Sequence, residues 1–316
     1  MIRIGFTMGD PAGVGPEVLL HALNDPLLRR QIRPIVFGDH DLLSRVAEQF
    51  GCDLDFELRQ VGQSDPSPGL VGKFTENGGR AQGAYLQAAA DAIQASEIDA
   101  LVTGPIHKRA LKVCNMPGPG QTEWLASRFG VEHPVMMLLG PSLKVVLATT
   151  HLALAKVPQA LNKADLVKTI TVAQRDLTRL FFPTGPRWAV AALNPHGEVD
   201  GEIGAEELNI LIPLVEELAS KGFCIRGPIA GDTVFALAAS GKFDVVLALY
   251  HDQGLAALKT LHFSEAVNVT LGLGLIRTAP DHGVAYDIAG RGQADPTSMK
   301  QATRLAVEMA RKNMFK

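Results

Sequence analysis

Short runs rich in valine, leucine and alanine alternate with amphipathic segments of helical periodicity along almost the whole 316-residue chain. Runs of this kind are typical of strands buried on both faces of a parallel sheet. The predicted strands are residues 2–7, 34–37, 100–103, 135–139, 144–150, 188–193, 245–250 and 266–271, and the clearest predicted helices are residues 78–95, 163–180, 205–221 and 296–312. This order predicts an α/β fold, with a mostly parallel sheet flanked by helices.

The length of the chain suffices for one large domain or two medium ones. The turns at residues 116–121 and 278–283, rich in glycine and proline, are the best candidates for domain boundaries. We therefore expect a terminal domain formed by residues 1–120 and 280–316, and a middle domain formed by residues 121–279. Residues 62–77 contain several Gly, Pro and Ser residues and are predicted to form a loop.

Charge and composition exclude several classes of partner. There are 30 Lys and Arg against 33 Asp and Glu, a net charge of -3, with no basic run, so neither nucleic acid nor an anionic membrane surface is expected as a partner. Neither a signal peptide nor an apolar stretch of the roughly 18 residues that a membrane span requires is expected. Cys52, Cys114 and Cys224 are scattered, which favours a reducing compartment and predicts a cytoplasmic protein.

Three histidines, His151, His196 and His251, follow directly after three of the predicted strands. Side chains just beyond the carboxyl ends of such strands line the crevice where α/β sheets bind ligands, and imidazole is a common ligand of zinc and similar ions. The pattern predicts a shared metal site, and the alternative is three loop histidines with ordinary structural contacts. Asp252, beside His251, is a candidate to orient a ligand, to act as a base, or to cap the next helix.

Three further turns are candidate binding sites. Residues 9–17 form a glycine-rich turn that presents backbone amides to an anion, or simply a tight turn into a helix. Lys108 follows a predicted strand and suits anion binding or proton transfer, with a solvated surface lysine as the alternative. Thr122, at a predicted helix start, is a candidate to bind a carboxylate or phosphate, or to cap the helix. Residues 281–296, here called the C-terminal loop, are long enough to wrap a ligand or form an ordinary connection.

An ordered series of motifs runs from about residue 9 to residue 292. Its members are Gly-Asp-Pro-Ala-Gly-Val-Gly-Pro-Glu17, Thr-Gly-Pro-Ile-His-Lys108, Thr-Thr-His151-Leu, Asn-Pro-His196-Gly-Glu, Tyr-His251-Asp-Gln-Gly, Val-Asn268-Val-Thr-Leu-Gly-Leu and Ile-Arg277-Thr. Together they resemble the PdxA family, the 4-hydroxythreonine-4-phosphate dehydrogenases of pyridoxal phosphate synthesis. The resemblance covers nearly the whole chain.

The resemblance implies a two-domain fold like that of isopropylmalate dehydrogenase, with the active site in the interdomain cleft. It implies one divalent metal, Zn, Mg, Mn or Co, bound at a site shared between the two subunits of a homodimer by His151, His196 and His251. The implied substrate contacts are Gln121, Thr122, Lys259, Asn268 and Arg277. The C-terminal loop looks like an adenosine-binding loop for NAD or NADP, with His282, Gly283, Ala285, Asp287 and Gly290 as the expected contacts.

The activity implied by the family is oxidation of a small phosphorylated hydroxy acid, 4-phosphohydroxy-L-threonine. The product, 2-amino-3-oxo-4-phosphooxybutanoate, decarboxylates to 3-amino-2-oxopropyl phosphate. Asp252 and Lys108 are the candidate bases. Three imidazoles favour zinc, whereas an oxygen-rich substrate chelate suits the other ions.

One position departs from the family. Family members commonly carry His where this chain has Gln121, and glutamine donates a hydrogen bond but does not become cationic. The alternative substrates are therefore 4-phospho-threonate or a carboxylated cis-dihydrodiol, although Lys259, Asn268 and Arg277 favour a small phosphorylated acid. An acyl or phosphate transferase of related fold is a third hypothesis, which the three histidines disfavour, and a non-catalytic metal-binding protein is a fourth.

Overall fold

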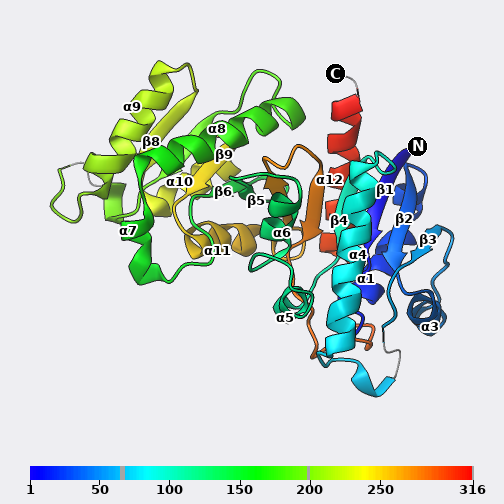
Figure 1. Ribbon diagram of the computed structural model, residues 1–316. Helices are drawn as coiled ribbons and strands as arrows, with labels where there is room; N and C mark the ends of the chain where they lie inside the picture. The colour runs from blue at the N-terminus through cyan, green and yellow to red at the C-terminus, as the bar shows by residue number, and fades with distance from the viewer. Residues whose placement is uncertain (65–67, 198–199, 315–316) are drawn as a thin grey trace. The chain divides into compact units, whose positions relative to one another are not determined.

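The computed structural model describes residues 1–64, 68–197 and 200–314. The chain divides into two compact units, which Figure 1 shows in ribbon form. The first unit comprises Met1–Glu132 and Leu273–Lys316, and the second comprises His133–Gly272. The second unit is thus inserted into the first along the sequence. In the part of the chain described here, no helix is both long enough and apolar enough to cross a membrane.

In the first unit, parallel strands lie in the order β3-β2-β1-β4-β11. The strands are β1 (Ile2–Thr7), β2 (Ile32–Gly38), β3 (Glu57–Gln60), β4 (Ala100–Thr103) and β11 (Arg277–Pro280). The helices are α1 (Gly15–Leu23), α2 (Pro26–Arg29), α3 (His40–Phe50), α4 (Glu76–Gln94), α5 (Lys108–Val113), α6 (Gln121–Arg128) and α12 (Thr297–Met314), with a short 3₁₀ turn η1 (Pro68–Leu70). Strands β4 and β11 are buried along their whole length. The apolar sequence of β4 is typical of a strand buried on both faces.

In the second unit the strand order is β10-β5-β6-β9-β7-β8. The strands are β5 (Val135–Leu139), β6 (Lys144–Leu147), β7 (Trp188–Ala191), β8 (Ile225–Ile229), β9 (Val245–Ala248) and β10 (Val267–Leu271). The pairs β10–β5 and β5–β6 are antiparallel, and the pairs β6–β9, β9–β7 and β7–β8 are parallel. The helices are α7 (Val157–Ala160), α8 (Lys163–Leu180), α9 (Ile212–Ser220), α10 (Gly231–Ala239) and α11 (His251–His262), with short turns η2 (Leu154–Lys156), η3 (Pro195–Gly197) and the π-helical η4 (Glu207–Leu211).

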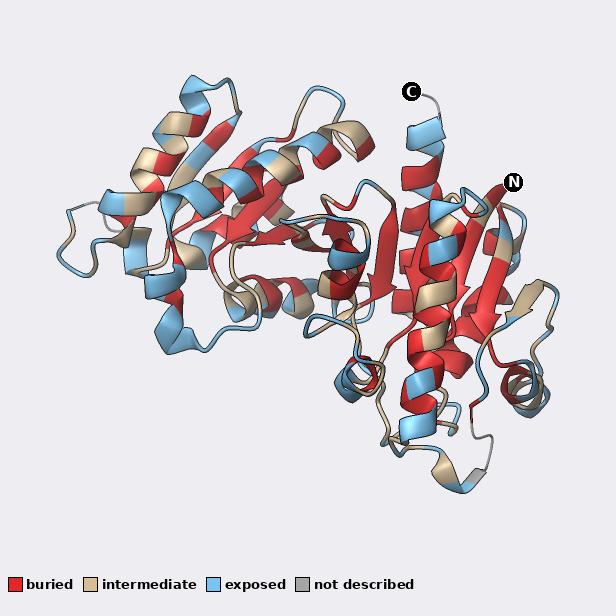
Figure 2. Ribbon diagram, viewed as in Figure 1, coloured by how far each residue is buried: buried red, intermediate tan, exposed pale blue. Residues whose placement is uncertain are grey.

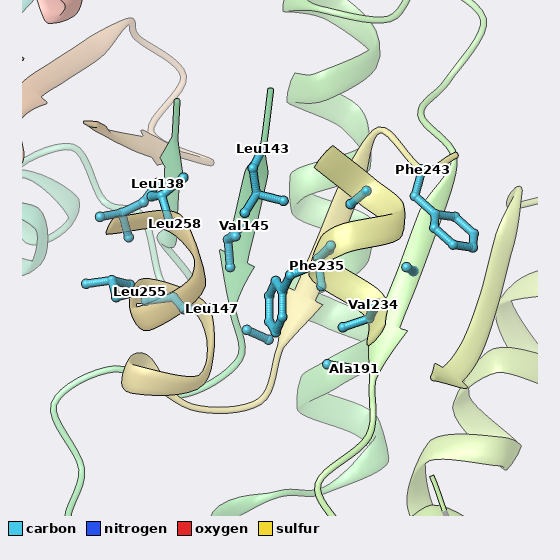
Figure 3. Packing of buried hydrophobic residues seen from close by; sticks show 14 of the residues in the cluster. Leu138, Leu143, Val145, Leu147, Ala191, Val234, Phe235, Phe243, Leu255 and Leu258 are labelled. Carbon is cyan, nitrogen blue, oxygen red and sulfur yellow. The ribbon is translucent and has the colours of Figure 1, made fainter. Parts of the chain in front are cut away.

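Helices α10 and α11 pack their apolar sides on the strands of the second unit. Figure 3 shows Val234 and Phe235 of α10, and Leu255 and Leu258 of α11, directed at strand side chains such as Leu147. These five side chains are all at most 8% exposed. The central strands are buried, while helices such as α8 and α12 bury one side only (Figure 2). The core therefore fixes the strand ends from which the candidate site residues emerge.

The predicted strands all correspond to strands of the structure, and three strands went unpredicted. Strands β3, with sequence Glu-Leu-Arg-Gln, and β8, with sequence Ile-Arg-Gly-Pro-Ile, end the strand orders of their units and are only partly buried. Strand β11, with sequence Arg-Thr-Ala-Pro, carries a charge and a proline. Charged residues in all three strands, and proline in β8 and β11, interrupt the apolar pattern on which the prediction depended.

The second unit is shorter at both ends than the predicted middle domain, residues 121–279. Helix α6 belongs to the first unit, where Gln121 donates a hydrogen bond to the Gly104 carbonyl at 3.0 Å and Arg128 pairs with Asp91. Strand β11 belongs there too, because it pairs with β4. The two turns predicted as domain boundaries, residues 116–121 and 278–283, therefore both lie within the first unit.

Candidate active site

The three histidines follow three strands that are neighbours in the second unit. Strand β9 lies between β6 and β7, and all three run parallel, so their carboxyl ends lie at one edge. His151 follows β6, His196 lies in η3 after β7, and His251 begins α11 after β9. Each strand ends two or three residues before the predicted end, so each histidine except the helical His251 lies on a short loop.

Two of the histidines are close together. The ring centroids of His151 and His251 are 5.9 Å apart. The Nδ1 atom of His251 lies 2.7 Å from a carboxylate oxygen of Asp252, and the Asp252 side chain is otherwise exposed. A carboxylate on Nδ1 favours the tautomer with its proton there, which leaves Nε2 with a free lone pair. That arrangement is the usual one for a metal-binding histidine.

The third histidine has an unusual backbone. His196 has φ 63° and ψ −2°, in the left-handed region that disfavours any residue with a side chain beyond glycine. Within the described ranges, no three His, Cys, Asp or Glu side chains converge closely enough to hold a metal ion. The single chain thus brings His151 and His251 together and leaves His196 at the neighbouring strand end. Glu198 and Val199, which follow in the same motif, lie outside the described residues.

Three predicted substrate contacts gather around the end of β4 in the first unit. Arg277, the first residue of β11, is buried and donates from Nε and Nη2 to Thr103 Oγ1 at 3.1 and 2.7 Å. Burial lowers the pKa of Arg277 to about 10, an effect that the negative charge of Glu123 opposes. The guanidinium therefore stays charged at neutral pH. Gln121 and Thr122 open α6 beside Gly104, the residue after Thr103.

The amide of Gln121 is oriented by its surroundings. Its Nε2 donates to the Gly104 carbonyl, so the amide oxygen is turned away from that carbonyl. This Oε1 is buried and has no hydrogen-bond partner among the described residues. Because a buried acceptor without a donor is costly, the position suits a ligand group that donates a hydrogen bond.

The C-terminal loop is bound to the glycine-rich turn of residues 9–17. The Val14 amide donates to the Val284 carbonyl at 2.9 Å, and a side chain on Gly13 would collide with that carbonyl. The Tyr286 hydroxyl donates to Asp10 Oδ2 at 2.6 Å. Burial raises the pKa of Asp10, and the hydrogen bond from Tyr286 acts against that rise. Two motifs at opposite ends of the sequence thus form one structure.

The predicted cofactor contacts lie on this loop. His282 Nδ1 donates a hydrogen bond to the Gly283 carbonyl at 2.9 Å, and its Nε2 is buried without a partner in the residues described. Gly283 faces open space. Ala285 and Gly290 have φ angles of 42° and 70°. Asp287 is exposed.

Sequence reasoning did not single out Asp10, Tyr286 or His107. The rings of His107 and Tyr286 are stacked, with centroids 5.6 Å apart and 11° between the planes. All three residues lie within motifs that the sequence analysis identified. The contact between the Asp10 carboxylate and Tyr286 depends on the fold, so the sequence alone did not indicate it. Lys108 begins α5, next to His107, with an exposed side chain.

The other two predicted substrate contacts lie in the second unit. Lys259 is on α11, with Nζ 5.8 Å from the centre of the Phe263 ring. Asn268 is a partly buried residue of β10, opposite Leu138 of β5. The predicted residues therefore form groups within each unit, the histidines with Asp252 in the second and Arg277 with Gln121 and Thr122 in the first.

Comparison with known proteins gives matches along nearly the whole chain. The model of the family described as pyridoxal phosphate biosynthetic protein PdxA matches residues 30–306. A protein of Desulforapulum autotrophicum named 4-hydroxythreonine-4-phosphate dehydrogenase is 41% identical over 323 residues, which cover 97% of this chain and 95% of that protein. A crystal structure of a protein of that name from Klebsiella pneumoniae is 34% identical, with a TM-score of 0.87, and the match covers 98% of this chain and all of the other.

More distant structures are also similar. A terephthalate 1,2-cis-dihydrodiol dehydrogenase from Burkholderia xenovorans is 27% identical, with a TM-score of 0.66 over 97% of this chain and 98% of the other. An isocitrate dehydrogenase from Methylococcus capsulatus is 16% identical, with a TM-score of 0.50 over 98% of this chain and 88% of the other. The latter likeness is one of fold, and it confirms the predicted fold class.

Proposed function

Because the chain belongs to the family described as pyridoxal phosphate biosynthetic protein PdxA, we propose that it oxidises 4-phosphohydroxy-L-threonine with NAD or NADP. When bound, the nicotinamide ring would accept a hydride from the secondary alcohol carbon, and the hydroxyl proton would pass to a base. The product, 2-amino-3-oxo-4-phosphooxybutanoate, is a β-keto acid. It loses CO₂ because its ketone accepts the electron pair of the broken carbon–carbon bond, and 3-amino-2-oxopropyl phosphate remains.

The observation that carries this proposal is the position of the histidines at three adjacent strand ends. We propose that His151, His196 and His251 hold one divalent cation, Zn, Mg, Mn or Co. The donor set fits such an ion, since His251 presents Nε2 while Asp252 engages Nδ1. When bound, a divalent cation supplies Lewis-acid polarisation of the alcohol that is oxidised.

The charges of the first unit suit the anionic ends of the substrate. Arg277 is buried and cationic, and its planar guanidinium suits a phosphate or carboxylate. Thr122 lies in the first turn of α6, where backbone amides also favour anions. Gln121 offers an acceptor for a hydroxyl or ammonium group. Lys259 and Asn268 of the second unit are proposed as further substrate contacts.

We propose that the C-terminal loop binds the dinucleotide through His282, Gly283, Ala285, Asp287 and Gly290. The Nε2 of His282 supports this, because it is buried without a partner among the described residues and a ligand would satisfy it. The open space beside Gly283 gives a ligand access to the backbone.

Two side chains are proposed as alternatives for the base. Asp252 adjoins His251, and its side chain is exposed. Lys108 is exposed at the start of α5. Asp252→Asn and Lys108→Met distinguish them, because only loss of the true base lowers kcat with the substrate KM retained.

We further propose a cytoplasmic homodimer in which the partner subunit completes the metal site. The three cysteines form no disulfide, in keeping with a reducing compartment. Light scattering of the purified protein measures the oligomeric state directly.

The second candidate is a dehydrogenase of the same chemistry on 4-phospho-threonate or a carboxylated cis-dihydrodiol. The likeness to the terephthalate dihydrodiol dehydrogenase and the presence of Gln121 both favour testing it. The experiment follows NADH absorbance with purified protein, NAD⁺, a divalent metal and each substrate in turn. Turnover of 4-phosphohydroxy-L-threonine supports the first proposal, and turnover of 4-phospho-threonate alone replaces it with the second.

A further inference from the structure

The side chain of Gln253 joins two strand ends. Its Oε1 accepts a hydrogen bond from the Leu249 amide at 2.7 Å, just beyond β9. Its Nε2 donates to the Ala192 carbonyl at 2.7 Å, just beyond β7. The two bonds use both ends of the amide, so its orientation is fixed. One side chain thus sets the separation of two neighbouring loops.

Each of these loops leads to a histidine. His251 follows Leu249 by two residues, and His196 follows Ala192 by four. A third link completes the set, since Thr149 Oγ1 donates to the Leu249 carbonyl at 2.8 Å, and His151 follows Thr149 by two residues. The backbone of Leu249 is therefore held at both its amide, which donates to Gln253, and its carbonyl, which accepts from Thr149.

The path from Ala192 to His196 is itself rigid. Glu207 is fully buried, and its Oε1 accepts the amides of Leu193 and Asn194 at 2.7 and 2.8 Å. Its Oε2 accepts the Asn194 side-chain amide at 2.7 Å. The segment from Ala192 to His196 is therefore held by hydrogen bonds at both its first residue, from Gln253, and its middle, from Glu207.

We infer that Gln253 is a positioning residue that holds the His251 and His196 loops at the spacing needed for a shared metal ion, an inference that rests on the proposed function of these histidines. Thr149 performs the same task for the His151 loop. Neither side chain is a ligand itself. Loss of an outer partner that orients metal ligands typically weakens metal binding by roughly 10- to 100-fold.

The test is isothermal titration of the full-length protein with Co²⁺, using His251→Ala to subtract binding elsewhere. Gln253→Met keeps the length of the side chain and removes both hydrogen bonds. Gln174→Met is the matched control, because Gln174 accepts a hydrogen bond from Trp188 at the opposite end of β7. Thr149→Val is a smaller change that removes only the bond to Leu249.

We expect the Co²⁺ Kd to rise roughly 10-fold or more in Gln253→Met, to rise in Thr149→Val, and to stay within twofold in Gln174→Met. A Kd within twofold of wild type in Gln253→Met overturns the inference and leaves the proposed function intact. Wild-type protein that binds Co²⁺ no better than His251→Ala overturns the proposed metal site and the inference with it. If Gln253→Met does not fold, Thr149→Val decides, and an unchanged Kd there also refutes the inference.

Discussion

The contact between Tyr286 and Asp10 gives a prediction that depends on pH. Burial is the largest influence on the Asp10 carboxyl group and raises its pKa above 3.8, while the hydrogen bond from Tyr286 lowers it. A carboxyl group with a raised pKa binds its proton more tightly in the folded chain than in the unfolded chain. Its contribution to stability therefore falls as the pH rises from about 3.8 through the pKa of the folded state.

Tyr286→Phe removes the hydroxyl that stabilises the ionised form of Asp10. The pKa of Asp10 then rises further, so the loss of stability is largest at neutral pH and smaller near pH 4. A hydrogen bond to a charged group contributes about 1.5–3 kcal/mol, and a neutral one about 0.5–1.5 kcal/mol. Since about 1 kcal/mol shifts the Tm of a unit of this size by roughly 2–4 °C, we expect a Tm lower by about 3–12 °C at neutral pH.

The assay is thermal unfolding, followed by circular dichroism at pH 7.5 and pH 4, of wild type and of Tyr286→Phe. Tyr250→Phe, in the second unit, is the control for loss of a tyrosine hydroxyl elsewhere. An equal fall in Tm at both pH values would show that the ionised carboxylate is not what Tyr286 stabilises. No fall at pH 7.5 would refute the contact itself.

Three further predictions concern single side chains. Arg277→Lys keeps the charge but loses the paired bonds to Thr103, so we expect the substrate KM to rise about 10-fold with little change in kcat, and a KM within twofold of wild type contradicts the role. His196→Ala and His196→Gly should both abolish the Co²⁺ binding seen by calorimetry. In urea unfolding, His196→Gly should be more stable than His196→Ala by about 1 kcal/mol, because glycine adopts the positive φ without strain. Equal stability of the two variants would exclude backbone strain at this position. Phe235→Ala should cost about 3–5 kcal/mol in the same unfolding experiment, and a loss below 1 kcal/mol would show that this core side chain contributes little.

The sequence predicted the fold class and the family correctly, and both are confirmed. The apolar runs identified β6, β7 and β9 because these strands are buried on both faces. Their order, β6-β9-β7, could not be predicted from the sequence, because pairing between strands far apart in the chain depends on packing rather than on local pattern.

Contacts over long sequence distances account for the residues that were missed. Asp10 and Tyr286 are separated by 276 residues, and neither residue has a local sequence pattern that predicts their hydrogen bond. Gln253 stood in the Tyr-His-Asp-Gln-Gly motif beside two named candidates, yet its role lies in two backbone contacts that no spacing rule reveals. The short strands β3, β8 and β11 were missed because charged residues in all three, and proline in β8 and β11, interrupt the apolar pattern.

The most direct test of the central proposal is the stoichiometry of the reaction. Purified protein with a divalent metal and NAD⁺ is supplied with 4-phosphohydroxy-L-threonine labelled with ¹³C in its carboxyl group, and NADH and ¹³CO₂ are measured together. An oxidative decarboxylation predicts that the two form in equal amounts, and that both are lost in His196→Ala. Absence of NADH with this substrate, or undiminished NADH formation in His196→Ala, would contradict the account.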